Sequence, residues 1–248
     1  MNAGLATLAA APGLALGSFL TVVAARLPVG RSILRPRSAC GACSSPLAWY
    51  DNVPLLSYAL LRGRCRSCAA RIPLRYPLVE ATTALLVVGS LLAYGATATA
   101  VLAALFCAVL VAVSVIDLEH RIIPNRIVVP AAAVVLVART VLDPSPAWAI
   151  AALGAAGFFL VAILVYPSGM GMGDVKLALL LGAMLGPTVP VALMIGMIAA
   201  LVPSLVLVAR HGSAARRMAL PFAPFLALGG VVALFAGERV LGAYLGAL

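Results

Sequence analysis

Charged residues are scarce in this chain of 248 residues. Asp and Glu together number seven, and charged residues of both signs make up only 10% of the sequence, whereas hydrophobic residues make up 64%. Ordinary soluble domains contain about 25% charged and about 45–50% apolar residues. The composition therefore excludes an ordinary soluble domain and predicts an integral membrane protein with several spans.

The sequence also lacks the short motifs of several enzyme classes. It contains no GxSxG, HExxH or Walker-type motif, and no glycine-rich Rossmann fingerprint marks a nucleotide site. The two histidines, His120 and His211, are too isolated for a catalytic triad. The few carboxylates are therefore the main candidates for chemistry.

Long apolar stretches define the predicted fold. An apolar helix of about 20 residues crosses the hydrocarbon core of a bilayer. Eight such stretches, of which the sixth is unusually short, cover residues 3–25, 78–95, 98–116, 127–143, 147–166, 175–187, 189–209 and 221–241. The first has no strongly basic leader before it and no small-residue cleavage site followed by a soluble domain, so we expect it to be retained. The predicted fold class is an all-α polytopic membrane protein with about eight transmembrane helices.

Basic residues indicate how the chain is oriented. The net charge of +10 could indicate nucleic-acid binding, but nine arginines lie together in the polar segment 26–77. Because loops rich in Lys and Arg stay in the cytoplasm, we expect this segment to be cytoplasmic and the chain to have no nucleic-acid partner. Carried through eight spans, this orientation places every basic residue except Arg139 and Arg239 on the cytoplasmic side, including Arg216 and Arg217.

The same charge pattern bears on the short sixth span. If residues 175–209 formed one helix, the basic cluster that begins at Arg210 would lie on the opposite side of the membrane. We therefore predict two short crossings with a break near Pro187. In this topology Asp117 closes an inward span and Asp174 opens an outward one, so both carboxylates are expected at the cytoplasmic interface.

Four of the five cysteines form two CxxC pairs in the segment 26–77. They are Cys40, Cys43, Cys65 and Cys68. Their spacing is typical of tetrahedral zinc ribbons and knuckles, and the neighbouring arginines favour the thiolate form that zinc needs. Two disulfides are the alternative, but a cytoplasmic location keeps thiols reduced. We predict a structural zinc ion that contributes folding free energy to a segment too short and polar for a large core.

Two aspartates stand beside long apolar runs, where ionisable groups are candidates for function. For Asp117 the alternative is a solvated boundary residue, and for Asp174 it is a helix N-cap. Gly171 and Gly173 permit close backbone approach, which capping alone does not require. If the two carboxylates face each other, repulsion favours one shared proton, which is the state that an aspartyl protease needs. We therefore predict a catalytic pair.

Two further charged residues are expected to support this pair. Lys176 is the only lysine of the chain, and it could either stabilise the Asp174 anion or contact lipid phosphates. Glu80 begins the second span, where pairing with an arginine such as Arg75 and a structural role are the simpler interpretation.

These motifs together resemble the prepilin peptidases, the type IV leader peptidase branch of the GxGD membrane aspartyl proteases. The similarity covers residues 17–20, 26–28, both CxxC pairs, 49–56, 62–65, 76–80, 116–117, 171–176 and 221–225. Thr21, Gly41 and Asn125 depart from the pattern usual in this family.

The resemblance implies a catalytic Asp117–Asp174 pair and a particular reaction. Members of the family cleave the basic leader of type IV prepilins and pseudopilins after a glycine, at the cytoplasmic face of the bacterial inner membrane. Many then methylate the new amino terminus with S-adenosylmethionine, whose binding residues the sequence does not identify. The implied organisation is a first transmembrane helix at 1–25, a zinc-binding cytoplasmic loop at 26–77 and a transmembrane peptidase domain at 78–248.

A proton-coupled transporter is the alternative from another class. Asp117, Asp174 and Glu80 would then form a proton relay, and the zinc loop would be a regulatory module. Transporters commonly contain inverted repeats and place their sites near the bilayer midplane. Neither feature is evident in this sequence, which favours the peptidase.

Overall fold

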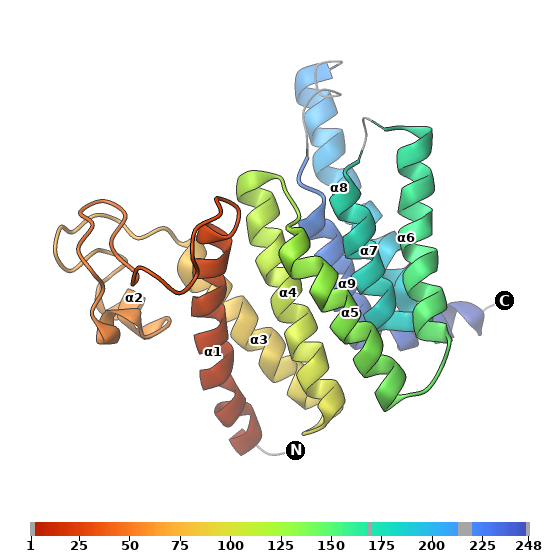
Figure 1. The fold of residues 1–248 in the computed structure, drawn as a ribbon, viewed down its shortest axis with the longest axis horizontal. Helices are drawn as coiled ribbons and strands as arrows, with labels where there is room; N and C mark the ends of the chain where they lie inside the picture. Colours follow the sequence, from red (N-terminus) through yellow and green to blue (C-terminus); the bar gives the residue numbers. More distant parts are fainter. Residues whose placement is uncertain (1–2, 168–169, 213–219, 247–248) are drawn as a thin grey trace. The chain divides into compact units, whose positions relative to one another are not determined.

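In the part of the chain that the structure describes, the regular elements are helices. The computed structural model describes residues 3–167, 170–212 and 220–246, and these residues form two compact units, Met1–Ala112 and Val113–Leu248 (Figure 1). Arg216 and Arg217, which are predicted to lie on the cytoplasmic side, are outside the described residues. The predicted all-α fold is confirmed.

The described ranges contain eight long helices and three short ones. The long helices are α1 (Ala3–Arg26), α3 (Arg75–Tyr94), α4 (Ala98–His120), α5 (Asn125–Leu142), α6 (Ala147–Val165), α7 (Met172–Leu185), α8 (Val189–His211) and α9 (Ala223–Leu245). The short ones are the 3-10 helices η1 (Trp49–Asn52) and η2 (Gly186–Thr188) and the α-helix α2 (Leu56–Leu60). Seven segments are long and apolar enough to cross a membrane when α7 and α8 are counted together as Met172–His211.

The predicted break near Pro187 is confirmed. The short helix η2 separates α7 from α8, and Gly186 has a φ of +55°, which an L side chain rarely adopts. The two helices run in opposite directions on either side of this turn (Figure 1). With 14 residues, α7 is about 21 Å long at 1.5 Å per residue, which is short for a hydrocarbon core of about 30 Å.

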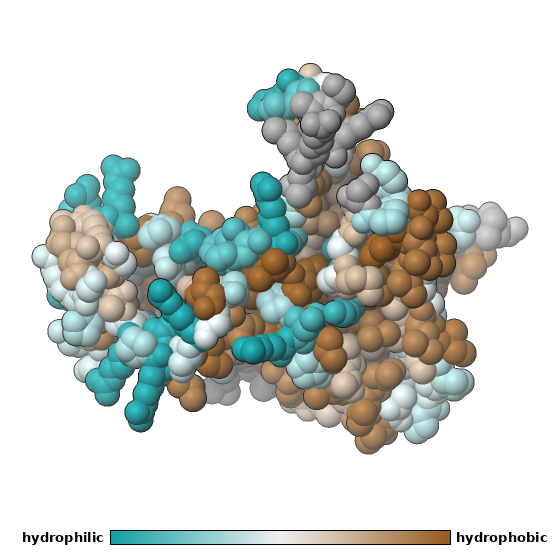
Figure 2. All heavy atoms as spheres, turned by 45° about the horizontal axis from the view of Figure 1, so that its top comes forward, coloured by the Kyte–Doolittle hydropathy of each residue, from teal (hydrophilic) through white to brown (hydrophobic). Residues whose placement is uncertain are grey.

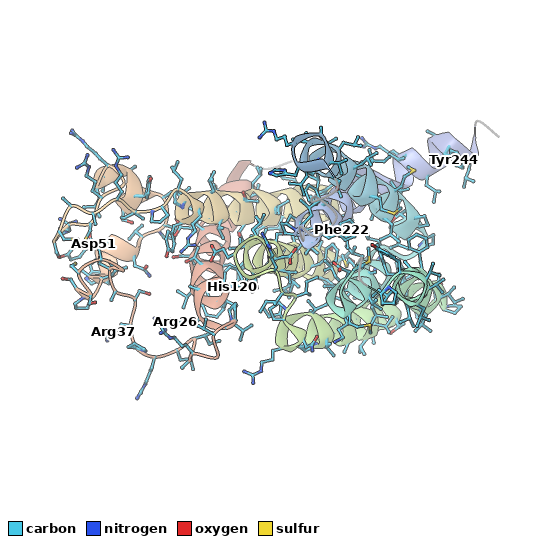
Figure 3. The ribbon with its side chains drawn as sticks, turned by 90° about the horizontal axis from the view of Figure 1, so that it is seen from above. Arg26, Arg37, Asp51, His120, Phe222 and Tyr244 are labelled. Atoms are coloured by element: carbon cyan, nitrogen blue, oxygen red, sulfur yellow. The ribbon has the colours of Figure 1, made fainter. Side chains whose placement is uncertain are left out.

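In the first unit, α1 and α3 pack closely through small residues. A Cβ atom on Gly13 would lie 2.8 Å from the Cα of Ala84, and one on Gly17 would lie 2.7 Å from the Cα of Glu80. Residues 27–74 connect the end of α1 to the start of α3. Figure 3 shows this segment, with Arg37 and Asp51 labelled, extending away from the two helices. The close packing of α1 and α3 therefore provides the base from which this segment extends.

In the second unit, α7 is the central helix. It packs against α5, α6 and α9, and the side chains of Leu177, Leu180 and Leu181 have no exposed surface. A helix that is apolar on all sides and surrounded by neighbours is expected to be buried. The outer helices instead expose hydrophobic side chains, such as Leu153 and Leu164 of α6, as lipid-facing surfaces do (Figure 2).

Glycine also sets the distance between α8 and α9. A Cβ atom on Gly229 of α9 would overlap the carbonyl oxygen of Ala192 on α8. We expect Gly229→Ala to force the helices apart and to lower the unfolding free energy by about 1–3 kcal/mol, as overpacking does. Thermal unfolding in detergent measures this loss.

Gly242→Ala is the matched control on the same helix. A Cβ atom there would meet nothing within 4 Å, and Ala is about 1 kcal/mol better than Gly within a helix. Equal midpoint temperatures for the two variants would contradict tight α8–α9 packing through Gly229.

Candidate functional site

The four cysteines of the segment between α1 and α3 converge. Their sulfur atoms all lie within 4.8 Å of one another, and the Sγ atoms of Cys40 and Cys68 are 3.8 Å apart. A tetrahedral zinc site with Zn–S bonds of about 2.3 Å separates its sulfur atoms by about 3.8 Å. A disulfide would need about 2.0 Å. The cluster therefore fits a tetrathiolate metal site.

Two equivalent turns create this cluster. In the first, the Ser44 N–H donates to the Cys40 carbonyl at 2.9 Å; in the second, the Ala69 N–H donates to the Cys65 carbonyl, also at 2.9 Å. Ser44 and Ala69 both have positive φ, +58° and +57°. Each CxxC turn is thus closed by a residue in the left-handed conformation, and the sulfur atoms of the two turns lie together.

Hydrogen bonding favours the thiolate form at two of the four cysteines. The bond with the Ser45 hydroxyl, followed by the one with the Ser45 backbone, lowers the pKa of Cys43 to about 6. Backbone hydrogen bonds, first that of Cys68, lower the pKa of Cys65. Both groups therefore lose their protons more readily than a free cysteine does. At Cys68 the backbone bond with Ala70 acts in the same direction, but the bond with the Cys43 thiol and burial raise the pKa to about 12.

An ion pair that the sequence did not predict links two parts of this segment, the helix η1 and the second CxxC turn. The Arg66 guanidinium reaches both carboxylate oxygens of Asp51, with its shortest contact at 2.6 Å, and it lies 5.3 Å from the Tyr50 ring centroid. The hydrogen bond from Arg66 lowers the pKa of Asp51. The pair connects η1 to the second CxxC turn, fifteen residues away.

Asp117 lies in the last turn of α4 and is 6% exposed. Its Oδ2 accepts a hydrogen bond of 3.0 Å from the N–H of Ala223, the first residue of α9. A helix N-terminus favours a negative group because its first N–H groups have no partner within the helix. Asp117 is therefore a buried anchor for α9 rather than a solvated boundary residue.

Asp174 lies in the first turn of α7 and is 8% exposed. The N-cap is Gly171, and the Oδ2 of Asp174 reaches back to accept its N–H at 3.1 Å. The negative charge of Asp117 also acts on Asp174. The structure thus brings both predicted carboxylates into the second unit, each fixed by the beginning of a helix.

The two glycines of the GxGD motif have different tasks. A Cβ atom on Gly173 would lie 2.7 Å from the Cβ of Ile123, in the loop that follows α4. A Cβ atom on Gly171 would come no closer than 3.8 Å to its neighbours. Gly173 therefore permits the close approach between α7 and the chain that follows Asp117, whereas Gly171 supplies the N–H for Asp174.

The structure gives each supporting residue a partner that the sequence did not predict. The Lys176 Nζ donates to the Asn125 Oδ1 at 2.7 Å and so joins α7 to the start of α5. The Glu80 Oε2, in the first unit, accepts the Leu55 N–H at 2.9 Å. Neither Ala223 nor Asn125 could be assigned a role from sequence, since these contacts span 106 and 51 residues.

Two protein-family models match the chain. The bacterial peptidase A24 N-terminal domain matches residues 12–94, and the type IV leader peptidase family matches residues 104–205. The first match includes the cysteine-containing segment, and the second runs from within α4 to within α8.

Curated relatives carry the same name in several bacteria. The prepilin leader peptidase/N-methyltransferase of Bacillus subtilis is 33% identical over 94% of this chain and 95% of its own length. The relative from Myxococcus xanthus is 43% identical over 70% of this chain and 54% of its own, and one from Burkholderia pseudomallei is 35% identical over 91% and 83%.

No solved structure matches the chain significantly. The resemblance seen in the motifs is confirmed by relatives that align along nearly the whole length. The chain belongs to the type IV leader peptidase family.

Proposed function

We propose that this chain is a membrane aspartic endopeptidase that removes the leader peptide from type IV prepilins or pseudopilins. The names of its relatives support this substrate class. The observation that carries the mechanism is the burial of Asp117 and Asp174 in one unit, with each carboxylate fixed by a backbone N–H at the start of a helix.

The proposed reaction uses one proton shared by the pair. The ionised carboxylate takes a proton from the attacking water, and the protonated one donates a hydrogen bond to the scissile carbonyl and then protonates the leaving amine. The backbone bonds to Ala223 and Gly171 orient both groups without adding a positive charge. In this mechanism the shared proton belongs to the pair rather than to either aspartate.

The cytoplasmic side of the bacterial inner membrane is the proposed location of this site. The chain is a multi-pass membrane protein of a bacterial family. The arginines between α1 and α3 support a cytoplasmic orientation for that segment under the positive-inside rule. We infer cleavage of a basic leader after a glycine, as the family resemblance implies.

A second proposed activity is methylation of the new amino terminus. The relatives are named for both activities, and S-adenosylmethionine would be the methyl donor. This proposal assigns peptide cleavage to the region 78–248 and a separate task to the region 26–77, after the first helix at 1–25.

Zinc is the metal we propose for the cysteine cluster. The donor set of four thiolates and the separation of 3.8 Å between Cys40 and Cys68 support a closed tetrahedral site. All four positions would be filled by protein, which leaves no position for water or substrate. The ion would therefore stabilise the segment 26–77 and take no part in hydrolysis.

Asparagine substitutions test the aspartyl mechanism. We expect Asp117→Asn and Asp174→Asn each to lower cleavage of a prepilin by about 1000-fold, because either change removes one member of an acid–base pair. The double variant should be little worse, since the two residues act as one unit. The measurement is initial cleavage rate of a substrate with a basic leader that ends in glycine, at equal folded yield.

Asp143→Asn is the matched control for these variants. Asp143 is an exposed residue between α5 and α6 and should tolerate the change. Cleavage by both active-site variants at the wild-type rate would refute the aspartyl mechanism. A wild-type protein that cleaves no prepilin but carries protons after reconstitution would establish the transporter instead.

Alanine substitutions test the glycine that permits close approach. We expect Gly173→Ala to lower the cleavage rate at least about tenfold, because the clash with Ile123 displaces Asp174, and a misplacement of 1 Å can cost about 100-fold. Gly171→Ala should cost less, since its Cβ has room. Gly154→Ala in α6, where a Cβ meets nothing within 4 Å, is the control. A larger loss for Gly171→Ala than for Gly173→Ala would contradict this assignment.

Metal analysis tests the cysteine cluster. We expect the purified protein to hold about one zinc ion per chain, and chelation to expose the arginines of residues 26–77 to trypsin, because zinc binding supplies folding free energy. Cys43→Ser should lose the metal, whereas Cys107→Ala, in α4, should retain it. Two disulfides in place of four titratable thiols would show that the zinc assignment is wrong.

A further inference from the structure

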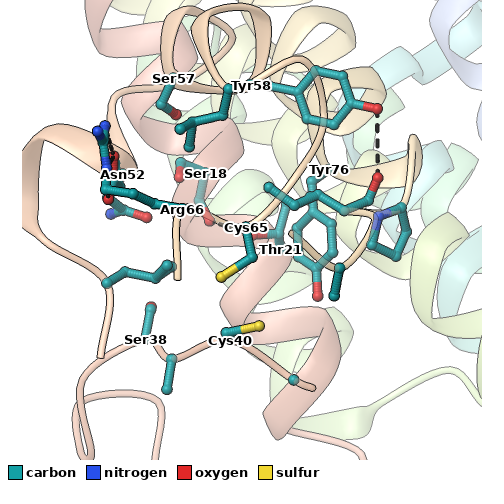
Figure 4. Close-up of a pocket in the computed structure, with 18 of the residues that line it drawn as sticks. Ser18, Thr21, Ser38, Cys40, Asn52, Ser57, Tyr58, Cys65, Arg66 and Tyr76 are labelled. Atoms are coloured by element: carbon teal, nitrogen blue, oxygen red, sulfur yellow. Dashed lines mark hydrogen bonds and ion pairs between the residues drawn. The ribbon is translucent and has the colours of Figure 1, made fainter. Parts of the chain in front are cut away.

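A cleft of about 570 Å³ lies in the first unit, between the cysteine-containing segment and the ends of α1 and α3 (Figure 4). Its volume lies within the range of about 300–1,000 Å³ typical of small-ligand sites. The proposed peptidase mechanism makes no use of it, because Asp117 and Asp174 both belong to the second unit. The charged groups of its lining indicate which other ligand it takes.

Arginine dominates the charged lining of this cleft. The two acidic residues of the lining are Asp51 and Glu80. The four basic ones come from the end of α1, the cysteine-containing segment and the start of α3, and they are Arg26, Arg66, Arg71 and Arg75. This excess of positive charge favours an anionic ligand over a cationic one.

Both acidic residues already have partners within the protein. The Arg66 guanidinium binds both carboxylate oxygens of Asp51, so this pair adds little net charge to the cleft. The Glu80 carboxylate is 8% exposed, and its Oε2 accepts the Leu55 N–H at 2.9 Å. One buried carboxylate is thus outnumbered by the three arginines outside the ion pair.

These three arginines are in place to hold an anion. The Arg26 Nη1 donates to the Ser32 carbonyl at 3.2 Å, which uses one of the five N–H donors of a guanidinium. The Arg75 guanidinium lies 5.1 Å from the centroid of the Tyr76 ring, which also lines the cleft. Arg71 is exposed, and its guanidinium makes no hydrogen bond with any residue that the structure describes.

The position of the cleft indicates the source of the anion. Arg26 is the last residue of α1 and Arg75 is the first residue of α3, and both helices are candidate membrane spans. The ends of such spans lie at the level of the lipid headgroups. Leu74 and Leu78, on either side of Arg75 in the chain, are exposed and offer apolar surface to acyl chains. Lipid phosphates are therefore available where the cleft lies.

We propose that this cleft binds the phosphate of an anionic phospholipid headgroup, with Arg26, Arg71 and Arg75 as its donors. Guanidinium groups match phosphate oxygens in geometry and charge, and basic pockets between membrane spans bind anionic headgroups. A soluble phosphate ester offers the same anion but no acyl chains. Because the arginines come from α1, the segment 27–74 and α3, one headgroup joins this segment to both helices. The inference goes beyond peptide cleavage and does not depend on it.

Lipid titration tests this site without any reaction. The full chain in detergent is titrated with phosphatidylglycerol or phosphatidylcholine, and bound lipid is counted by native mass spectrometry. We expect one phosphatidylglycerol to bind at least about tenfold more tightly, because the choline ammonium of the other lipid is repelled by the arginines. Arg71→Gln should lower the affinity for phosphatidylglycerol by about tenfold, since it removes a charge-assisted hydrogen bond. Arg26→Gln is a second test variant with the same expected loss.

Arg37→Gln is the matched control. Arg37 is an exposed arginine of the same segment that does not line the cleft, so its loss changes the net charge equally and should leave the affinity unchanged. Equal affinity of the wild type for the two lipids would overturn the inference. So would an equal effect of the control and of both test variants.

A soluble competitor distinguishes the two sources of phosphate. Glycerol 3-phosphate should bind at least about 100-fold more weakly than phosphatidylglycerol, because it lacks the acyl chains that contribute to lipid binding. Equal affinities for these two probes would show that the cleft takes a free phosphate ester and would refute the lipid assignment.

Amide hydrogen exchange tests the link between the segment and the helices. In nanodiscs, exchange within residues 27–74 of the wild type and of Arg37→Gln should be at least about threefold slower with phosphatidylglycerol than with phosphatidylcholine, since a bound ligand stabilises the state that binds it. Arg71→Gln should show the same exchange in both lipids. A wild type that exchanges equally in the two lipids would contradict a headgroup that joins the segment to α1 and α3.

Discussion

Two buried carboxylates impose the main constraint on the second unit. A carboxylate costs about 2.5–3.5 kcal/mol at the centre of a bilayer and less near the ends of the spans, where these two lie, but a buried one still needs hydrogen-bond donors. Asp117 finds one at the first turn of α9, and Asp174 finds one just before α7. Because the first N–H groups of a helix have no partner within it, each helix start and each carboxylate satisfy one another. The candidate site and the packing of the helices thus depend on the same bonds.

Small residues make this arrangement possible. Gly173 lets α7 approach the loop after α4, and Gly182 brings the backbone of α7 against Ala151 of α6. Helices in lipid associate mainly through such close packing, since lipid chains are as apolar as the side chains themselves. A short α7 surrounded by other helices can therefore hold a charged residue near its end without exposing it to lipid.

Different interactions stabilise the first unit. The segment between α1 and α3 is too polar for a large apolar core, and the four thiols and the Asp51–Arg66 pair stabilise it instead. Its two CxxC turns repeat the same backbone bonds. A cleft lies between this segment and the ends of α1 and α3, and the hydrogen bond from the Leu55 N–H to Glu80 joins the segment to α3.

The sequence by itself determined the all-α membrane fold, the break near Pro187, the cysteine cluster and the two candidate carboxylates, which the structure buries in the second unit. These features depend on local composition and spacing: apolar runs, a Gly-Pro turn, paired CxxC motifs and acids that are rare elsewhere. The tertiary structure decided what each residue contacts. Ala223 as partner of Asp117, Asn125 as partner of Lys176 and Leu55 as partner of Glu80 lie 106, 51 and 25 residues away. Pairings over such separations follow from how helices pack, and no local pattern encodes them.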